Sequence, residues 1–215
     1  MRQRTLRAKH ALIAKYHASG KVLDVGCGTG DFLAYLHAQG YSTQGVEVSP
    51  DARAIAQTKT TAIAPDLDSV PSHNQFNVVT LWHVLEHVAD PATTLRHLHA
   101  LCSPGALLVI AVPDRESWDC NHYGPQWAAW DVPRHLSHFR RQDIRTLLQQ
   151  AEFDLVEIRR MWWDAPYVAM LSEQYNGANP FMVLLKGATV GMWSNLMAFA
   201  SGLPTSSSLY IAQKQ

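Results

Sequence analysis

The sequence contains little cysteine, and what it has is poorly placed for cross-linking. Three cysteines, Cys27, Cys102 and Cys120, occur among 215 residues. They are too few and too irregularly spaced for a disulfide framework, and no Cys-x-x-Cys pair indicates a zinc site. The N-terminus also lacks the sustained apolar core and the small-residue cleavage pattern of a signal peptide. We therefore expect a reducing compartment, the cytoplasm.

The chain also lacks net charge, because 18 Lys and Arg balance 18 Asp and Glu. This balance argues against nucleic acid as a partner, since a long nucleic-acid groove needs an excess of cations. Four basic residues, Arg2, Arg4, Arg7 and Lys9, do lie close together. A solvated helix face explains them more simply than contact with an anionic substrate or cofactor carboxylate. Without repeats or low-complexity tracts, the length predicts a single domain over residues 1–215.

No uninterrupted apolar run is long enough to make a transmembrane helix. The stretch 181–203 has the required length of about 20 residues, but Lys186, Ser194 and Asn195 lie inside it. We expect an apolar helical insertion over residues 163–207, forming a pair of buried or capping helices. Peripheral contact of residues 178–204 with a membrane is the alternative, and a true span is the least favoured interpretation.

What the chain does have is a distinctive unit from Lys21 to Pro50. An apolar run precedes glycines at positions 26, 28 and 30, then come a helical pattern and a second apolar run that ends at Glu47. Strand, glycine turn and helix form a nucleotide-type site, because glycines allow close approach and the helix N-terminus offers free N–H groups. Glu47, about 20 residues after the first glycine, can accept hydrogen bonds from ribose hydroxyls.

The spacing of this unit distinguishes between two cofactor classes. A dinucleotide fingerprint requires a glycine at position 31, where this chain has Asp31. An aspartate at the start of the helix would also repel a pyrophosphate. A cofactor that carries a cation and no phosphate fits better.

Beyond this unit, strands and helices alternate, which predicts an α/β sheet. Residues 1–20 hold a leading helix over 5–19, which would cover the cofactor pocket. Residues 113–139 break the alternation with a long loop rich in aromatic and histidine residues, and such loops are usually functional. The expected later strands are 61–64, 77–81, 106–112, 153–161 and 208–212, and the expected later helices begin at Pro50 and cover 91–101 and 141–150.

Two motifs in order carry a family resemblance. VLDVGCGTG at Val22–Gly30 resembles motif I of class I S-adenosylmethionine-dependent methyltransferases, and FNVVTLWHVLEHVADP at Phe76–Pro91 resembles the segment around their fourth strand. Leu107–Asp114 and Trp130–Phe139 resemble the branch that includes ubiquinone-biosynthesis-like and many uncharacterised bacterial enzymes. The resemblance implies a Rossmann-like doubly wound seven-stranded sheet, mostly parallel with an antiparallel last strand. It also implies S-adenosyl-L-methionine as the cofactor and S-adenosyl-L-homocysteine as the product.

The resemblance further implies the cofactor site. The three glycines pass under the methionine part of the cofactor, and Asp24 accepts from its ammonium group. Asp66 and Leu67 hold the adenine, with Asp68 as runner-up, unless they only form a surface turn. Trp82 borders the adenine or the transferred methyl group, where an aromatic face suits a sulfonium, or it only packs in the core. The full predicted set is Asp24, Gly26, Cys27, Gly28, Gly30, Glu47, Val48, Asp66, Leu67, Leu81 and Trp82.

Methyl transfer needs alignment, exclusion of water and an acceptor that has lost its proton. Groups after the fourth and fifth strands overlook the expected crevice, which makes His83, His122, Asp131 and His135 the candidate bases. We favour His135 and then His122, because imidazole titrates near neutrality. The alternative is that these histidines only hold the loop together. The loop's aromatic residues would line an apolar acceptor pocket or pack the loop down; they are Trp118, Tyr123, Trp127 and Trp130.

Three other interpretations fit parts of the sequence. His83–His87 spells H-x-x-E-H, a zinc signature of some metalloproteases, but it directly follows a strand instead of lying on a helix, so we expect no metal. An NAD(P)-dependent oxidoreductase lacks support, since Tyr210–Lys214 has the letters of a Tyr-x-x-x-Lys motif but lies on the last strand. A non-catalytic cofactor-binding subunit is the third. The favoured function is methylation of a small-molecule acceptor, apolar or lipid-attached, at oxygen; the oligomeric state is not predicted.

Overall fold

The computed structural model describes residues 2–60, 62–72 and 75–215, and within these it contains one seven-stranded sheet. The strand order is β3-β2-β1-β4-β5-β7-β6, and β7 runs antiparallel to both of its neighbours. The predicted Rossmann-like, mostly parallel sheet with an antiparallel last strand is therefore confirmed. The strands are β1 (Lys21–Val25), β2 (Ser42–Val46), β3 (Ile63–Ala64), β4 (Phe76–Trp82), β5 (Cys102–Pro113), β6 (Phe153–Arg160) and β7 (Ser207–Lys214).

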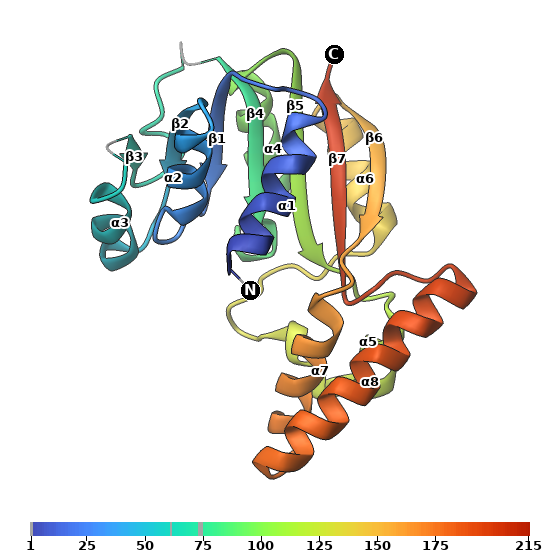
Figure 1. Ribbon diagram of the computed structural model, residues 1–215. Helices are drawn as coiled ribbons and strands as arrows, with labels where there is room; N and C mark the ends of the chain where they lie inside the picture. The colour runs from blue at the N-terminus through green and yellow to red at the C-terminus, as the bar shows by residue number, and fades with distance from the viewer. Residues whose placement is uncertain (1, 61, 73–74) are drawn as a thin grey trace.

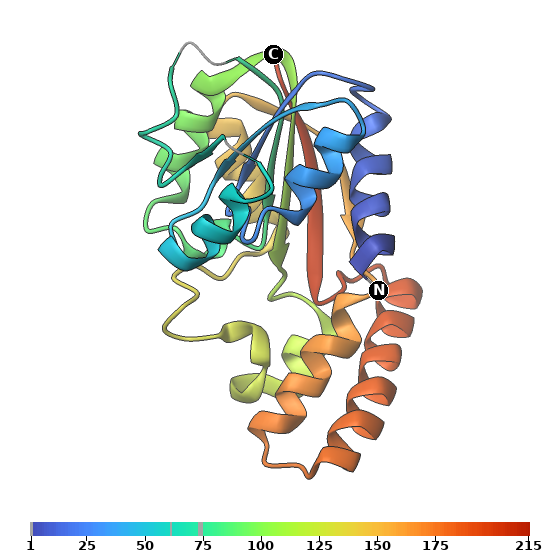
Figure 2. The ribbon, with the colours of Figure 1, turned by 60° about the vertical axis from the view of Figure 1, so that its left-hand side comes forward.

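Helices cover both faces of this sheet (Figures 1 and 2). Successive strand residues point to opposite faces, so Val22 packs with one helix pair and its neighbour Leu23 with the other. One face holds α1 (Arg2–Ala14) and α2 (Asp31–Ala38), and the opposite face holds α4 (Pro91–Leu101) and α6 (Arg141–Gln150). Burial on both faces explains the continuous apolar run of β5.

Local sequence signals set several helix boundaries as expected. Ser49 and Asp90 accept hydrogen bonds at the starts of α3 (Pro50–Gln57) and α4, and a proline follows each cap. The leading helix differs, because α1 ends at Ala14 and not near 19; the Ile13 carbonyl then accepts from the amides of residues 16 and 17. Strand β5 also begins at Cys102, before the turn expected at 104–105. Thr61, the first residue of the expected third strand, lies outside the described residues.

The segment 113–139 is less loop-like than predicted. It forms α5 (Trp118–Tyr123) and two 3-10 turns, η2 (Gly124–Gln126) and η3 (Ala128–Trp130). A buried Asp119 carboxylate organises the segment: it accepts hydrogen bonds from Trp127 Nε1, at 2.7 Å, from Ser194 Oγ, at 2.9 Å, and from Ser206 Oγ, at 2.7 Å. This carboxylate therefore ties the segment to α8 (Pro180–Ser201) and to the chain leading into β7.

The predicted helical insertion is present as α7 (Asp164–Tyr175) and α8 (Pro180–Ser201), which lie beyond the carboxyl ends of the parallel strands (Figure 1). The two helices pack very closely, since a Cβ atom added at Gly187 or Gly191 would lie 2.3 Å from Met170 Cγ or 2.4 Å from Pro166 Cα. The expectation of buried helices holds for this face alone.

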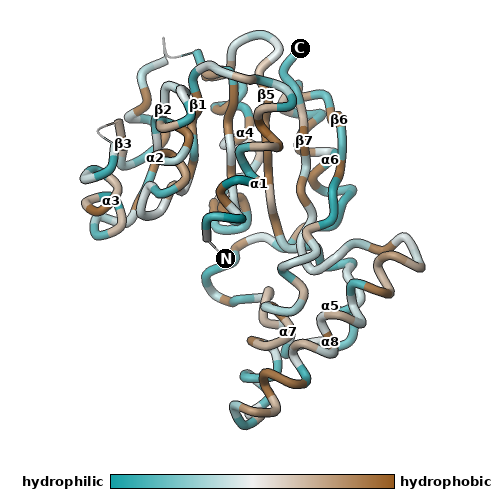
Figure 3. Tube along the Cα trace, viewed as in Figure 1, coloured by the Kyte–Doolittle hydropathy of each residue, from teal (hydrophilic) through white to brown (hydrophobic). Residues whose placement is uncertain are grey.

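The opposite face of α8 is exposed and apolar, and Figure 3 shows apolar residues along the helix. The large apolar side chains that it presents to solvent are Phe181, Leu184, Leu185, Met192, Trp193, Leu196 and Phe199. Across the described residues, no helix combines the length and the apolar character needed to cross a bilayer.

Candidate cofactor and acceptor site

The glycine turn after β1 has the backbone geometry that a close ligand approach requires. The amides of Gly26 and Cys27 both donate to the Val46 carbonyl, at 2.8 and 3.0 Å, which fixes the turn against β2. Gly26 has φ 69°, and a Cβ atom there would lie 2.4 Å from Val84 Cγ2. Gly28 has φ 55°, but no atom of the described chain lies within 4 Å of its hypothetical Cβ. The turn therefore needs Gly26 for packing and leaves Gly28 open to a ligand.

Glu47 is buried at the end of β2 and holds this turn in place. Its Oε2 accepts from the Gly28 amide and its Oε1 from the Ser49 amide, both at 2.8 Å. A carboxylate offers about four lone-pair positions, so two remain for hydroxyl donors of a ribose. The residue predicted as the ribose ligand thus also supports the loop.

Asp24 places a buried carboxylate beside the turn. It is 3% exposed, and Thr80 Oγ1 donates to its Oδ1 at 2.5 Å. Burial raises the pKa of Asp24 to about 6, against the opposing effects of the Thr80 hydrogen bond and the attraction of Lys9. Such a carboxylate favours a cationic partner, as the ammonium group of the predicted cofactor would be.

Trp82, at the carboxyl end of β4, forms an aromatic surface next to Asp24. Lys9 Nζ of α1 lies 4.1 Å from the centroid of the Trp82 ring, and Phe32 packs edge-on at 6.0 Å. Burial lowers the pKa of Lys9, although Asp24 and Asp164 act to raise it. A ring face that already accepts an ammonium cation suits a sulfonium as well. The sequence did not indicate Phe32 or Thr80 as site residues. Phe32 is one apolar residue of a helical pattern and Thr80 lies within a strand, and neither pattern is specific to a site.

The remaining predicted cofactor residues differ in what they offer. Cys27 packs in the interior with Leu33, Ala56 and Ile63, and Leu81 is fully buried, so neither side chain faces the turn. Gly30 caps α2 with φ 75°. Val48 is 76% exposed and free to contact an adenosine.

Asp66 and Leu67 lie in a surface turn, which was the alternative to a role in adenine binding. Asp66 is exposed, and its Oδ1 accepts from the Ser69 amide at 2.8 Å. The Ser69 side chain and then this amide lower the pKa of Asp66. Leu67 packs against the core. A role in adenine binding stays a prediction.

His83 follows β4 in a left-handed conformation, φ 57°, which is uncommon for a residue with a side chain. Its Nδ1 lies 3.3 Å from Glu86 Oε1 and its Nε2 3.3 Å from Asp164 Oδ2. Burial alone would lower the pKa of His83, but the two carboxylates outweigh it and raise the pKa to about 9. The imidazole is therefore protonated at neutral pH, so His83 is a poor candidate for the base.

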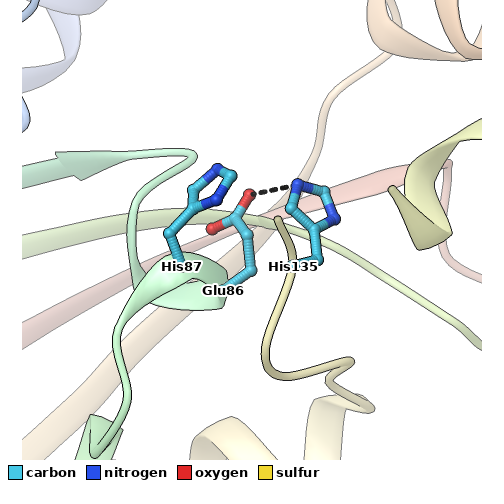
Figure 4. Close-up of side chains that lie close together, drawn as sticks. All are labelled: Glu86, His87 and His135. Atoms are coloured by element: carbon cyan, nitrogen blue, oxygen red, sulfur yellow. Dashed lines mark ion pairs between the residues drawn. The ribbon is translucent and has the colours of Figure 1, made fainter. Parts of the chain in front are cut away.

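Glu86, His87 and His135 meet beside this position (Figure 4). Glu86 and His87 belong to a 3-10 turn, η1 (Leu85–His87), so the H-x-x-E-H letters do not lie on an α-helix. The Glu86 carbonyl accepts from the amides of Leu136 and Ser137, at 2.8 and 3.1 Å, which brings His135 across the turn. His135 Nε2 then lies 4.0 Å from Glu86 Oε1, and one potential ligand atom of each residue falls within 4.8 Å of the others.

The other two predicted bases behave differently. Asp131 Oδ1 accepts from Arg134 Nη2 at 2.6 Å, and its Oδ2 lies 3.8 Å from His135 Nε2, so Asp131 belongs to the same cluster. His122 is exposed on α5 and stacks on Trp118, with ring centroids 4.8 Å apart.

The aromatic side chains of the loop mainly pack against one another and against the insertion. Trp127 is buried, and Trp130 Nε1 donates to the Gly124 carbonyl at 2.8 Å. His138 Nε2 lies 2.7 Å from the Trp130 carbonyl. The interpretation that this segment is packed down therefore fits the structure better than an open aromatic pocket.

Comparison with known proteins gives a family for this arrangement. A family model described as a methyltransferase domain matches residues 1–158. A ubiquinone biosynthesis O-methyltransferase of Pseudomonas aeruginosa strain PAO1 is 29% identical over 135 residues, which are 58% of each chain. One of Xanthomonas oryzae pv. oryzae strain PXO99A is 24% identical over 162 residues, 68% of each chain. This chain thus spans less than two thirds of the length of the Pseudomonas relative.

Solved structures agree in fold. A SAM-dependent methyltransferase from Archaeoglobus fulgidus superposes with a TM-score of 0.66 at 17% identity, covering 100% of this chain and 95% of that one. Phosphoethanolamine N-methyltransferase 2 from Haemonchus contortus, in complex with S-adenosyl-L-methionine, gives 0.63 at 16% identity, covering 97% and 52%. The cyclase SpnF gives 0.66 at 19%, covering 99% and 81%, so this fold alone does not determine the reaction.

Proposed function

Because this chain belongs to the methyltransferase-domain family, within the class I S-adenosylmethionine-dependent group, we propose that it methylates an oxygen of a small, apolar or lipid-attached acceptor. The relatives named as ubiquinone biosynthesis O-methyltransferases support oxygen as the acceptor atom. The family match favours this reaction over the NAD(P)-dependent alternative. The observation that carries the proposal is the open face of Gly28 between two buried carboxylates, those of Asp24 and Glu47.

The residues around this turn fit S-adenosyl-L-methionine. Gly28 admits a ligand where a Cβ would lie, Glu47 keeps acceptor positions for a ribose, and Asp24 offers a negative partner to an ammonium group. Trp82 provides the aromatic face for a cation. When bound, the cofactor supplies an electrophilic methyl group on a sulfonium, whose loss leaves a neutral thioether.

The chain's own task is then to align the acceptor and remove its proton. As the new C–O bond forms and the C–S bond breaks, the hydroxyl proton must pass to a base. Among the predicted bases, His135 has the suitable geometry: its Nδ1 lies 2.8 Å from the Ala129 carbonyl, which can only accept, so Nε2 carries the lone pair. Burial lowers the pKa of His135, which favours this neutral form. We therefore assign His135 as the group at the acceptor end, with Asp131 beside it.

The exposed face of α8, defined above, supports a further part of the proposal. An apolar acceptor is concentrated in membranes, and a helix that exposes aromatic and leucine side chains on one face can bury them in a lipid surface. We propose that this chain works from the cytoplasm, as its three free, buried cysteines suggest, and touches the membrane through α8.

Ligand-induced stabilisation tests the cofactor assignment. S-adenosyl-L-homocysteine at about 100 times its dissociation constant should raise the free energy of unfolding by roughly 2.7 kcal/mol, whereas NAD at the same concentration should leave it unchanged. Thermal denaturation of the chain with each ligand in parallel measures this difference. The absence of a shift with the sulfur nucleoside, or a larger one with NAD, would contradict the proposal. Binding without methyl transfer to any hydroxylated aromatic would favour the non-catalytic subunit.

A further inference from the structure

We propose that Glu86, His87 and His135 form a binding site for a divalent metal ion of the zinc or manganese type. The sequence alone led us to expect no metal, because the letters of the H-x-x-E-H motif follow a strand. The structure instead combines two residues of that motif with a histidine almost fifty positions later in the chain.

Glu86 supplies a buried carboxylate that no well-aligned hydrogen bond satisfies. Its side chain is 1% exposed, and in the described part of the chain neither carboxylate oxygen has a hydrogen-bond partner. Buried carboxylates are normally hydrogen-bonded, paired or bound to a metal. His83 lies near, but it is shared at 3.3 Å between Glu86 and Asp164, so one imidazolium faces two carboxylates. The cluster therefore has room for further positive charge.

In each histidine a backbone carbonyl holds one ring nitrogen. His87 Nδ1 lies 3.0 Å from the Arg134 carbonyl, and His135 Nδ1 lies 2.8 Å from the Ala129 carbonyl. A carbonyl oxygen can only accept, so each Nδ1 carries the proton and each Nε2 keeps its lone pair. Metal-binding histidines typically donate their other ring N–H to a carbonyl or carboxylate in this way, which fixes the ring.

The distances between the potential ligand atoms are somewhat longer than those around a bound metal ion. Potential ligand atoms of the three residues lie within 4.8 Å of one another. Two ligands of a tetrahedral zinc ion at ~2.1 Å are themselves ~3.4 Å apart. Closing the site therefore needs a movement of about 1 Å per side chain, and His87 lies on the exposed side of the cluster.

Two imidazoles and one carboxylate are a donor set typical of zinc and manganese, and three protein ligands leave a coordination position open. Resting on the proposed function, this position would bind the acceptor's oxygen and acidify its hydroxyl, which then loses its proton to water. His135 Nε2 cannot bind an ion and take up a proton at once, so an occupied site would make His135 a ligand in place of the base.

Metal binding to the chelator-treated full chain tests the proposal directly. Titration calorimetry with zinc chloride, and separately with manganese chloride, should show one ion per chain for at least one metal. His87→Ala should weaken this affinity by roughly 100-fold, and Glu86→Gln similarly. The matched control His37→Ala removes an exposed histidine of α2 and should bind as the wild type does.

Two outcomes would overturn the site: no saturable binding of either metal by the wild type, or unchanged affinity in His87→Ala. Glu86 is buried and its substitution can prevent folding, whereas His87 is exposed, so His87→Ala alone keeps the test decisive. S-adenosyl-L-homocysteine binding is measured on the same samples. Metal binding without nucleoside binding would contradict the proposed function and support the metal site. Nucleoside binding without metal binding would support the proposed function and contradict the metal site.

Discussion

At the scale of single residues, Asp24 makes the stability of the chain depend on pH. Its pKa is about 6 in the folded chain and near 3.8 in the unfolded chain, so folding makes its ionisation harder. Below pH ~3.8 both states are protonated and no penalty exists. Between pH ~3.8 and about 6 the unfolded chain ionises this group while the folded carboxyl stays protonated, so the penalty grows, and above this range it levels off at about 3 kcal/mol.

We therefore predict that Asp24→Asn, which cannot ionise, removes this dependence. The wild type should lose up to about 3 kcal/mol of unfolding free energy relative to the variant between pH 4 and 7. Urea unfolding of both chains at several pH values measures the difference. A difference that stays flat, or that favours the wild type as the pH rises, would show that Asp24 is not the group described here.

Residues of the site differ in how far the sequence could predict them. Glu47 follows from its position at the end of the second strand, because the carboxyl ends of parallel strands meet at one edge, whereas Asp24 was implied by the resemblance to motif I. The association of Glu86 with His135 could not be predicted. It depends on the amides of Leu136 and Ser137 reaching the Glu86 carbonyl, a contact between segments without a repeating pattern.

At the scale of the element, two glycines of the turn between β1 and α2 have different roles: Gly26 is needed for packing, and Gly28 leaves space for a ligand. An alanine at either position adopts an unfavourable positive φ, which costs about 1 kcal/mol. At Gly26 the new Cβ would also lie 2.4 Å from the stiff, β-branched Val84, whereas at Gly28 it meets open space.

We predict that Gly26→Ala lowers the free energy of unfolding by roughly 2–4 kcal/mol, the sum of strain and overpacking. Gly28→Ala should cost only about 1 kcal/mol of stability but weaken binding of S-adenosyl-L-homocysteine at least tenfold. Chemical denaturation and calorimetry on the two variants check this contrast. Adding Val84→Ala to Gly26→Ala should restore part of the lost stability, and equal behaviour of the two glycine variants would contradict the assignment.

Among whole elements, those with a local apolar periodicity were predictable, and the short ones held by tertiary contacts were not. α2, α4 and α6 begin and end where periodicity predicts, with Asp90 as a side-chain cap at the start of α4. α5, η2 and η3 escaped prediction, because their order depends on the Asp119 carboxylate binding Trp127 together with two distant serines. The stop of α1 at Ala14 has no such local signal either.

At the scale of the whole molecule, α8 gives the chain one surface unlike the rest. Its inner face is made of small residues, Gly187, Gly191, Ser194 and Ala198, which allow α7 to pack closely. This packing turns the large apolar side chains outward as one stripe. A contiguous exposed apolar patch of this kind marks a protein or membrane contact.

We predict that the wild type floats with vesicles of phosphatidylcholine and phosphatidylglycerol in a density gradient. Replacing Phe181, Trp193 and Phe199 together by serine should abolish flotation, because each exposed aromatic ring buries its apolar area only in the lipid interface. These side chains are exposed, so the free energy of unfolding should change little.

The matched control replaces exposed apolar residues outside the insertion, Ile55 and Val156, by serine, and it should float as the wild type does. A wild type that stays in the dense fraction, or a triple variant that still floats, would contradict the membrane contact. Size-exclusion chromatography without vesicles distinguishes the other use of such a stripe. If the wild type is a dimer that the triple variant dissociates, α8 meets a second copy of the chain, and the stripe is then buried in the dimer before it can reach a lipid surface.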